Sequence, residues 1–191
     1  MKKTFLLMLI CFVVIICNAQ SNHLSFKGIP IEGSVSDFST NLAAQNYRIL
    51  DSNENTCFLM GNFAGCDDVT IAVVGTPKTN IVYRITVFFD KKDSFSSLNV
   101  QYESFVKRYT DKYGKPEQSY SFFLDPYYKG DGYELQALRQ NKCRYISFFE
   151  VPNGHISIEI SRLQKVVINY EDMIGVKLYN EEKDKIVDND I

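Results

Sequence analysis

The spacing of apolar residues between positions 95 and 113 predicts the most regular helix of the chain. At about 100° per residue, one set of side chains falls within an arc of roughly 100°. This set comprises Phe95, Leu98, Tyr102, Phe105, Val106, Tyr109 and Tyr113. Asp93 or Ser94 can cap the start of the helix, and Gly114 followed by Lys115-Pro116 ends it. We expect the apolar face of this helix to pack on a sheet.

Alternating residues predict strands over much of the remaining chain. Between positions 81 and 89 the odd positions are Ile, Tyr, Ile, Val and Phe, and this period of two is typical of a strand with one face towards a core. Similar stretches cover 56–63 and 68–74, turning at Ala64-Gly65, and then 119–124, 133–139, 143–150, 155–162 and 166–170. Asn153-Gly154 tolerates positive φ angles and predicts a primed hairpin turn.

The segments before the first and after the last of these strands complete the pattern. Residues 23–30 form a short strand-like stretch, and Ser34 or Ser36 can begin a helix that runs to about Asn46. Its apolar face would carry Val35, Phe38 and Leu42. The tail from Asp172 fits two structures: apolar residues alternate as in a strand over 174–178, whereas Asp172 can cap a charged helix through 181–185. We expect the helix.

The two halves of the chain have the same order of elements, one helix followed by about four antiparallel strands. Such a sheet buries one face beneath its helix. The sequence therefore predicts an α+β protein of two tandem helix-plus-antiparallel-sheet units, residues 20–90 and 91–171. Residues 172–191 are expected to form a charged C-terminal helix or tail.

Residues 1–19 have the features of a secretory signal peptide. Lys2 and Lys3 precede an apolar run over residues 5–16, which is too short to span a membrane, and Ala19 provides a small residue for cleavage. We expect a periplasmic or secreted protein that begins near Gln20, with no transmembrane segment in the mature chain. Lipid attachment at Cys17 is an alternative, disfavoured because Ile16 stands where a small residue normally precedes such a cysteine.

Three short segments carry a resemblance to known proteins: residues 26–31 (FKGIPI), 62–65 (NFAG) and 112–116 (KYGKP). These segments resemble recurrent segments of a family of uncharacterised secreted bacterial proteins, and the resemblance covers nearly the whole mature chain. The helix ending in KYGKP and the strands after it also resemble, in topology, the tandem helix-plus-sheet fold of beta-lactamase-inhibitor-like periplasmic proteins. The resemblance implies a fold and an address outside the cytoplasm, and it assigns no functional residue.

Three cysteines, Cys57, Cys66 and Cys143, remain after removal of the leader. Pairing Phe63 opposite Cys66 across the predicted hairpin places Cys57 near Ala72, too far from Cys66 for a disulfide. We expect thiols that behave as small buried hydrophobic groups. The alternative is one bridge, which would involve Cys143 because it alone lies in the second half.

The sequence contains no group that stands out as catalytic, cofactor-binding or metal-binding. Ser104 and Lys107 match the S-x-x-K pattern of serine acyl-enzymes, but both fall on the solvent side of the predicted helix and the other motifs of those enzymes are missing. His23 and His155 have no supporting spacing for a metal site, and Asp67-Asp68 is typical of a solvated turn. We expect no cofactor.

One region is unusually rich in aromatic residues, residues 120–133, here called the tyrosine segment. Its tyrosines are interrupted by Pro126, Gly130 and Gly132, as in a loop rather than a core strand. Tyrosines in loops give rigid contact area with a polar tip, which is typical of binding surfaces. We predict Tyr120, Tyr127, Tyr128 and Tyr133 as binding residues. The alternative is that Phe122 and Leu124 face the core, while the tyrosine rings fold inward and cover loop backbone.

Charge and composition narrow the function without identifying it. The formal net charge is −2, and loss of Lys2 and Lys3 with the leader makes it −4, which argues against a nucleic-acid partner. The favoured hypothesis is an exported, non-enzymatic binding or inhibitor-like module that engages a protein or glycan outside the cytoplasm. The alternative is an extracytoplasmic hydrolase whose site is assembled from scattered residues.

Overall fold

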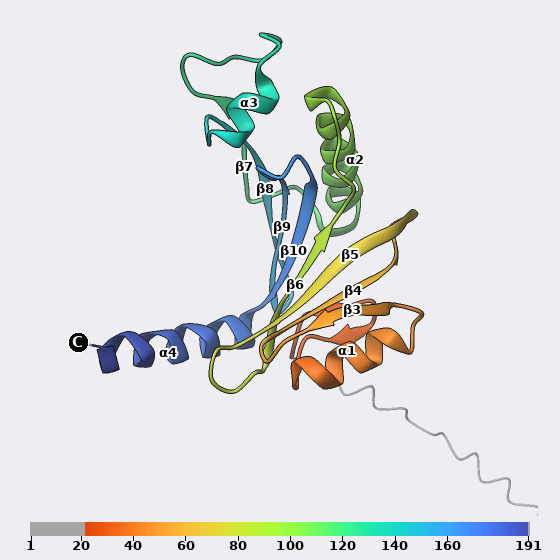
Figure 1. Ribbon diagram of the computed structural model, residues 1–191, viewed down its shortest axis with the longest axis vertical. Helices are drawn as coiled ribbons and strands as arrows, with labels where there is room; N and C mark the ends of the chain where they lie inside the picture. Colours follow the sequence, from red (N-terminus) through yellow and green to blue (C-terminus); the bar gives the residue numbers. More distant parts are fainter. Residues whose placement is uncertain (1–21, 191) are drawn as a thin grey trace, which may run out of the picture.

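A computed structural model of the protein describes residues 22–190; the predicted leader over 1–19, with Cys17, lies outside the described residues. This part of the chain has a mixed α+β fold with antiparallel strands, as predicted, and eight of its strands form one large sheet (Figure 1). Its helices are α1 (Val35–Ala43), α2 (Phe95–Tyr113), α3 (Glu134–Arg139) and α4 (Met173–Asp190). Its strands are β1 (Ser25–Phe26), β2 (Ile29–Pro30), β3 (Arg48–Ser52), β4 (Thr56–Phe63), β5 (Cys66–Gly75), β6 (Val82–Phe88), β7 (Gln118–Phe123), β8 (Cys143–Val151), β9 (Gly154–Ile160) and β10 (Val166–Asp172).

The large sheet has eight strands in the order β3-β4-β5-β6-β10-β9-β8-β7, and every neighbouring pair is antiparallel. The strands before α2 form one side of the sheet and those after α2 form the other. The two sides meet where β6 pairs with β10, with Val87 opposite Ile168. The strands β1 and β2 form a separate small hairpin.

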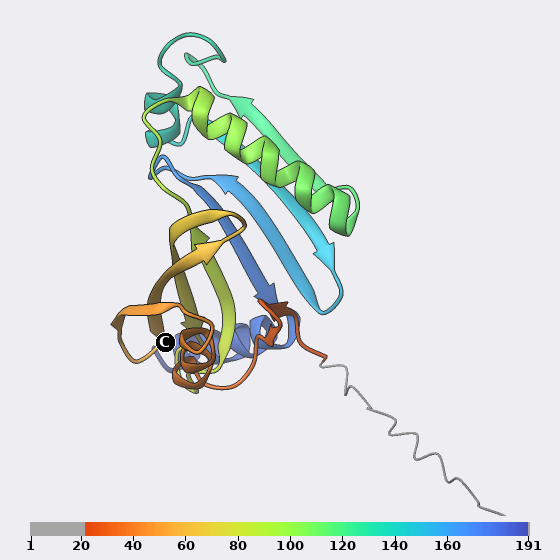
Figure 2. The same ribbon diagram turned by 90° about the vertical axis from the view of Figure 1, so that its right-hand side faces the viewer.

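Helices cover the two faces of the sheet unequally. The helix α1 contacts β4 and β5, and α2 contacts β8, β9 and β10; both lie on the same side of the sheet (Figures 1 and 2). The helix α4 contacts β6, β9 and β10 from the other side and then projects away from the body of the molecule. Much of that second face is therefore left without a covering helix.

The sequence correctly predicts the longest helix. Ser94 caps α2, since its Oγ accepts a hydrogen bond from the backbone N–H of Ser97 at 3.1 Å. The helix ends at Gly114, whose φ of 92° is accessible to glycine at little cost. The predicted face is the buried one, with Phe95, Leu98, Tyr102 and Phe105 in the core. The first helix is also confirmed, with Ser34 as its cap.

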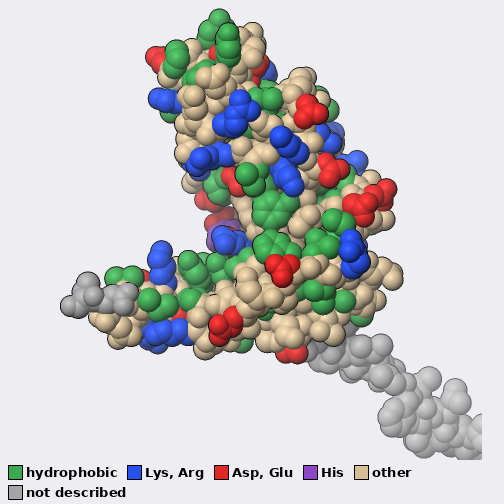
Figure 3. All heavy atoms as spheres, in the orientation of Figure 1, with side chains coloured by type: hydrophobic (Ala, Val, Ile, Leu, Met, Phe, Trp, Pro, Cys, Tyr) green, Lys and Arg blue, Asp and Glu red, His purple; other side chains and the backbone are tan. Residues whose placement is uncertain are grey.

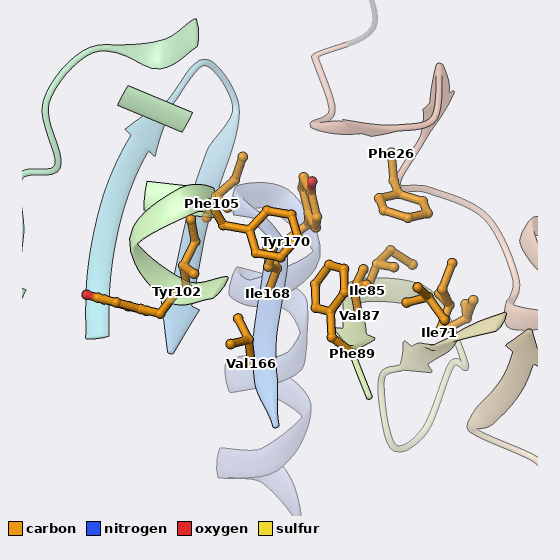
Figure 4. Close-up of a cluster of buried hydrophobic side chains, with 14 of the residues drawn as sticks. Phe26, Ile71, Ile85, Val87, Phe89, Tyr102, Phe105, Val166, Ile168 and Tyr170 are labelled. Atoms are coloured by element: carbon orange, nitrogen blue, oxygen red, sulfur yellow. The ribbon is translucent and has the colours of Figure 1, made fainter. Parts of the chain in front are cut away.

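The core is continuous across the β6–β10 pairing. Phe105 of α2 packs on Phe89, which follows β6, with ring centroids 4.4 Å apart, and Phe26 of the β1–β2 hairpin packs edge-on against Tyr170 of β10 at 5.1 Å (Figure 4). On the opposite face, Thr86 donates a hydrogen bond to Asn169 at 2.8 Å. Side chains on both faces therefore bind the first half of the chain to the second.

The tail forms a helix, as expected, and Asp172 begins it. The Oδ2 atom of Asp172 accepts a hydrogen bond from the backbone N–H of Gly175 at 2.8 Å, and Oδ1 accepts one from Leu24 at 2.7 Å. Further along α4, Tyr179 stacks on Tyr83 of β6 with ring centroids 4.6 Å apart. This contact differs from the predicted alternation, which places Tyr83 on the same face as Ile85. A register shift between Val74 and Gly75 explains it, because the shift changes the phase of β6.

Two further local predictions were wrong. Residues 133–139, predicted as a strand, contain the short helix α3, in which Ala137 and Leu138 are buried. The hairpin between β8 and β9 has Pro152 and Asn153 as its two central residues, and only Asn153 has a positive φ, 69°. Proline followed by a residue with positive φ is typical of a type II turn rather than a primed turn. Gly154 is needed for a different reason, since a Cβ there would lie 2.2 Å from the carbonyl oxygen of Glu171.

Candidate functional site

The tyrosine segment begins on β7, the edge strand of the large sheet, and ends at the start of α3. Its side chains are exposed to different degrees. Tyr128 and Tyr133 are 66% and 61% exposed, Tyr120 is 42% exposed, and Tyr127 is half-buried. The alternative that the rings fold inward therefore does not describe Tyr128 or Tyr133.

The structure brings three of the four predicted residues together. Tyr127, Tyr128 and Tyr133 line one small hollow of about 290 Å³, together with Pro126 and Asp131. Tyr120 lies apart from them, in a second shallow hollow between β7 and β8. The predicted set is therefore one cluster of three rings and one separate ring on the sheet.

Hydrogen bonds from backbone N–H groups to acidic side chains hold the backbone of this cluster. The carboxylate of Asp131 accepts from the backbone N–H of Tyr128 at 3.0 Å and from that of Tyr133 at 2.7 Å. Glu134, in the first turn of α3, accepts from the N–H of Gly130 at 2.9 Å. Both exposed rings are thus attached to a backbone that is fixed by a single carboxylate.

Tyr127 is held by its own side chain. Its hydroxyl donates to Oε1 of Gln140 and accepts from Nε2 of Gln136, each at 3.0 Å. These bonds attach the ring to α3 and to the residue after it. Tyr127 therefore serves as a support for the cluster, whereas Tyr128 and Tyr133 present their rings to solvent.

Apolar exposure is concentrated in the tyrosine segment. Among the described residues, five of the twelve exposed large hydrophobic side chains lie within it. They are Tyr120, Phe122, Leu124, Tyr128 and Tyr133. Figure 3 shows hydrophobic side chains at the upper tip of the molecule, where this segment and α3 lie. Concentrations of this kind mark interaction sites more often than single exposed residues do.

The alternative prediction that Phe122 and Leu124 face the core is wrong, because they are 40% and 46% exposed. Tyr120 and Phe122 lie two residues apart on β7, so they are on the same face of the sheet as Gln118. Phe148 of β8 is opposite Gln118 and lies on that face too. The sequence signal for this exposed aromatic face was the alternation along β7 of two serines, Ser119 and Ser121, with aromatic residues. Phe123, on the other face, packs against Phe95 and Tyr145.

The S-x-x-K match does not form a catalytic pair in the structure. Lys107 is exposed, and its Nζ atom contacts the carboxylate of Asp111 at 2.6 Å. Ser104 is exposed one turn earlier on α2. Among residues 22–190 no group of three or more His, Cys, Asp or Glu side chains is arranged to hold a metal ion.

The two histidines lie near the end of β10 but on different faces. His155 is opposite Glu171 in the sheet, whereas Nδ1 of His23 contacts Asp172 at 2.9 Å. Consecutive residues of a strand point to opposite faces, so the two imidazoles do not share a site.

The cysteines are separate thiols in the described structure. Cys57 and Cys143 are buried, and Cys66 is half-buried at the start of β5. Burial, with a smaller effect of the nearby charge of Glu134, raises the pKa of Cys143 to about 12. Such a thiol carries little thiolate and is a poor nucleophile at neutral pH.

None of the four helices in the described part of the chain has the length and apolar character needed to cross a bilayer. Compared with known proteins, the chain matches no protein family, no curated protein and no solved structure.

Proposed function

We propose that the protein is an exported, non-enzymatic binding module whose tyrosine segment engages a protein or glycan outside the cytoplasm. The observation that carries this proposal is the pair of exposed rings, Tyr128 and Tyr133, whose backbone N–H groups both bond to Asp131. A backbone that is already held in place loses little conformational entropy on binding, so more of the contact energy of the rings is retained in the complex.

The chemistry of the cluster suits either class of partner. Tyrosine combines an apolar ring with a hydroxyl, and it is enriched among the residues that contribute most to protein interfaces. Tyr120 and Phe122 extend the aromatic surface along the edge of the sheet, both about 40% exposed. A sugar ring would stack on the same aromatic faces.

We propose further that the fold consists of two tandem helix-plus-sheet units. The first unit is α1 with β3–β6 and the second is α2 with β7–β10, joined into one sheet through β6 and β10. This order supports the resemblance to beta-lactamase-inhibitor-like periplasmic proteins, and with it an inhibitor-like mode of binding through exposed side chains. Export rests on the leader sequence over residues 1–19.

The test is a double substitution, Tyr128→Ala with Tyr133→Ala. Both side chains are exposed, so the variant should fold with the stability of the wild type to within about 1 kcal/mol. The matched control is Leu163→Ala with Val187→Ala, which removes two comparably exposed apolar side chains, 64% and 50%, from other parts of the surface. Circular dichroism spectra check the fold of all variants.

Binding is measured in two arms. A photoreactive phenylalanine analogue at position 129, or at position 188 as the control, is used to trap protein partners in cells that export the chain; both positions are exposed and neither is changed in the double variants. Insoluble cell-wall glycan and soluble neutral polysaccharides are tested by co-sedimentation and by affinity electrophoresis.

We expect binding in one of the two arms, seen either as a crosslinked product specific to the tyrosine segment or as a retained complex with the glycan. The amount of this product or complex should fall at least tenfold in the tyrosine double variant and should be unchanged in the control double variant. The proposal is wrong if neither arm detects binding. It is also wrong if the two double variants bind as well as the wild type.

A further inference from the structure

A groove runs along α2 on the helix-covered side of the molecule, away from the tyrosine segment. Two hollows make it up, with volumes of about 530 and 580 Å³. The first lies between α2 and the β4–β5 turn, and the second lies between α2 and residues 24–28. The two hollows share Ala64, Phe105 and Arg108, so we treat them as one site, here called the α2 groove. Figure 2 shows α2 in front of the sheet with both hairpins beside it.

The α2 groove is lined by cations and contains no carboxylate. Lys92 and Arg108 line the first hollow, and Lys27, Arg108 and Lys112 line the second, whereas no Asp or Glu lines either. This is unexpected for a chain with 23 acidic and 21 basic residues. Within residues 22–190, none of these four cations has a carboxylate within ion-pair distance. The positive charge of the groove is therefore uncompensated.

Between the cations the wall of the groove is apolar and aromatic. Val100 is 67% exposed in the first hollow, and Phe63 and Tyr113 line the second beside the buried Phe105. Lys112 lies over the ring of Tyr113, 4.7 Å from its centroid. The groove thus places cationic groups along the rim of an apolar surface.

We propose that the α2 groove binds a small amphiphilic anion, a single molecule with one carboxylate headgroup on an apolar body. From Ser96 to Lys112 the helix extends about 24 Å at 1.5 Å per residue, long enough for an extended alkyl chain. Each hollow has the size of a small-molecule site. Arg108, which belongs to both hollows, holds the carboxylate, and the aromatic wall covers the chain.

The proposal names a free molecule rather than a membrane surface. A bilayer presents its headgroups to a protruding or flat cationic face, whereas this groove is recessed between α2 and two hairpins. The site shares no residue with the tyrosine segment, so this proposal is tested independently of the function proposed above.

The experiment is a calorimetric titration of the purified protein with sodium dodecanoate below its micellar concentration. Dodecanol and dodecyltrimethylammonium carry the same chain with a neutral and a cationic headgroup. We expect dodecanoate to bind with a stoichiometry of one, dodecanol to bind at least tenfold more weakly, and the cation to show no binding. Equal binding of dodecanoate and dodecanol, or no binding of dodecanoate, overturns the proposal.

Variants locate the site. Arg108→Gln combined with Lys112→Gln should weaken dodecanoate binding about tenfold or more, the effect of losing charge-assisted hydrogen bonds. Lys107→Gln is the matched control, because it removes a cation from α2 that is 76% exposed and outside the groove. It should leave the affinity unchanged. Equal effects of the double variant and the control would contradict the proposal.

A second variant tests the apolar wall without removing a cation. Val100→Asp introduces a carboxylate into the exposed part of the groove and should weaken dodecanoate binding, whereas Val187→Asp on α4 should not. Vesicles containing anionic phospholipid form the last arm. Binding to vesicles through Arg108 and Lys112 in the absence of dodecanoate binding would assign the groove to a membrane surface and overturn the proposal.

Discussion

Glu182 is a carboxylate in the middle of α4 that is almost completely buried, with 4% of its surface exposed. Its oxygens accept hydrogen bonds from the backbone N–H of Lys78 at 2.7 Å and from the N–H and hydroxyl of Thr79. Burial acts to raise the pKa of Glu182, but these hydrogen bonds lower it by more, so the pKa lies below its usual range. A single ionised side chain thereby attaches the projecting helix to the loop between β5 and β6.

This attachment predicts a defined dependence on pH. Because the pKa is lowered in the folded state, the stabilisation is fully present above the unfolded value of about 4.3 and is lost as pH falls through the folded pKa. Glu182→Gln keeps the size of the side chain but cannot ionise. We expect it to lower the free energy of unfolding by about 1 kcal/mol at pH 7. The difference from wild type should shrink below about pH 4.

Urea denaturation followed by circular dichroism between pH 7 and pH 3 measures this difference. Glu181→Gln is the control, because Glu181 is exposed and its contact with Lys177, at 4.0 Å, contributes little. A gap between wild type and Glu182→Gln that stays constant over the whole range would show that ionisation of Glu182 does not stabilise the fold.

At the scale of elements, α2 is the helix on which the second half of the sheet packs. Leu98 is completely buried and Phe105 is 5% exposed, whereas Ser104 and Lys107 are exposed on the opposite side. Leu98→Ala or Phe105→Ala should lower the free energy of unfolding by roughly 2–5 kcal/mol, through lost burial and the cavity left behind. Ser104→Ala and Lys107→Ala should each change it by less than about 0.5 kcal/mol. Chemical denaturation of the four variants decides this, and similar losses in both pairs would mean that the wrong face is assigned to the core.

The sequence predicts α2 well because its signals are local: a long apolar arc, a serine cap and a glycine at the end. It misses β3 because all five residues of that strand are exposed, so no alternation exists to be detected. It assigns α3 wrongly because a six-residue helix has too few turns to be stable alone and depends on burying Ala137 and Leu138. The misplacement of Tyr83 follows from a register shift between strands, which is a property of the pair and not of either strand.

For the candidate binding residues, too, the sequence predicts what depends on local signals and misses what depends on contacts between segments. The aromatic content and the turn residues of the tyrosine segment predict an exposed loop, and Tyr128 and Tyr133 are exposed. Tyr128 and Tyr133 lie together because the carboxylate of Asp131 bonds to the backbone of both, and Tyr127 is held in the same cluster by hydrogen bonds between its hydroxyl and side chains of α3 and of the residue after it. Composition alone does not contain that geometry, and it could not separate Tyr120 from the other three.

At the scale of the whole molecule, the two halves share one sheet and one core. Arg84 of β6 contacts Glu171 of β10 at 3.6 Å, and Thr86 of β6 donates a hydrogen bond to Asn169 of β10 at 2.8 Å. Apolar side chains from both halves belong to the same buried cluster. Neither half can therefore unfold without exposing the core and the strand edge of the other.

We expect a single cooperative unfolding transition in urea, despite the repeated order of elements. Far-ultraviolet circular dichroism and tyrosine fluorescence should give the same midpoint. Leu42→Ala in the first half and Leu98→Ala in the second should each move the whole transition, since both residues are completely buried. Two separate transitions, with each variant shifting only one, would show that the halves are independent domains.

The pairing of β6 with β10 also has a consequence for the time course of folding. Val87 and Ile168 are partners although they lie 81 positions apart along the chain. A ribosome adds roughly 5–20 residues per second, so a newly made β6 waits several seconds for its neighbour. During that interval the seven-residue strand Val82–Phe88 presents a bare apolar edge, the kind of edge that recruits strands from other molecules. A holding chaperone would therefore protect this protein most during the interval in which β6 has been made and β10 has not.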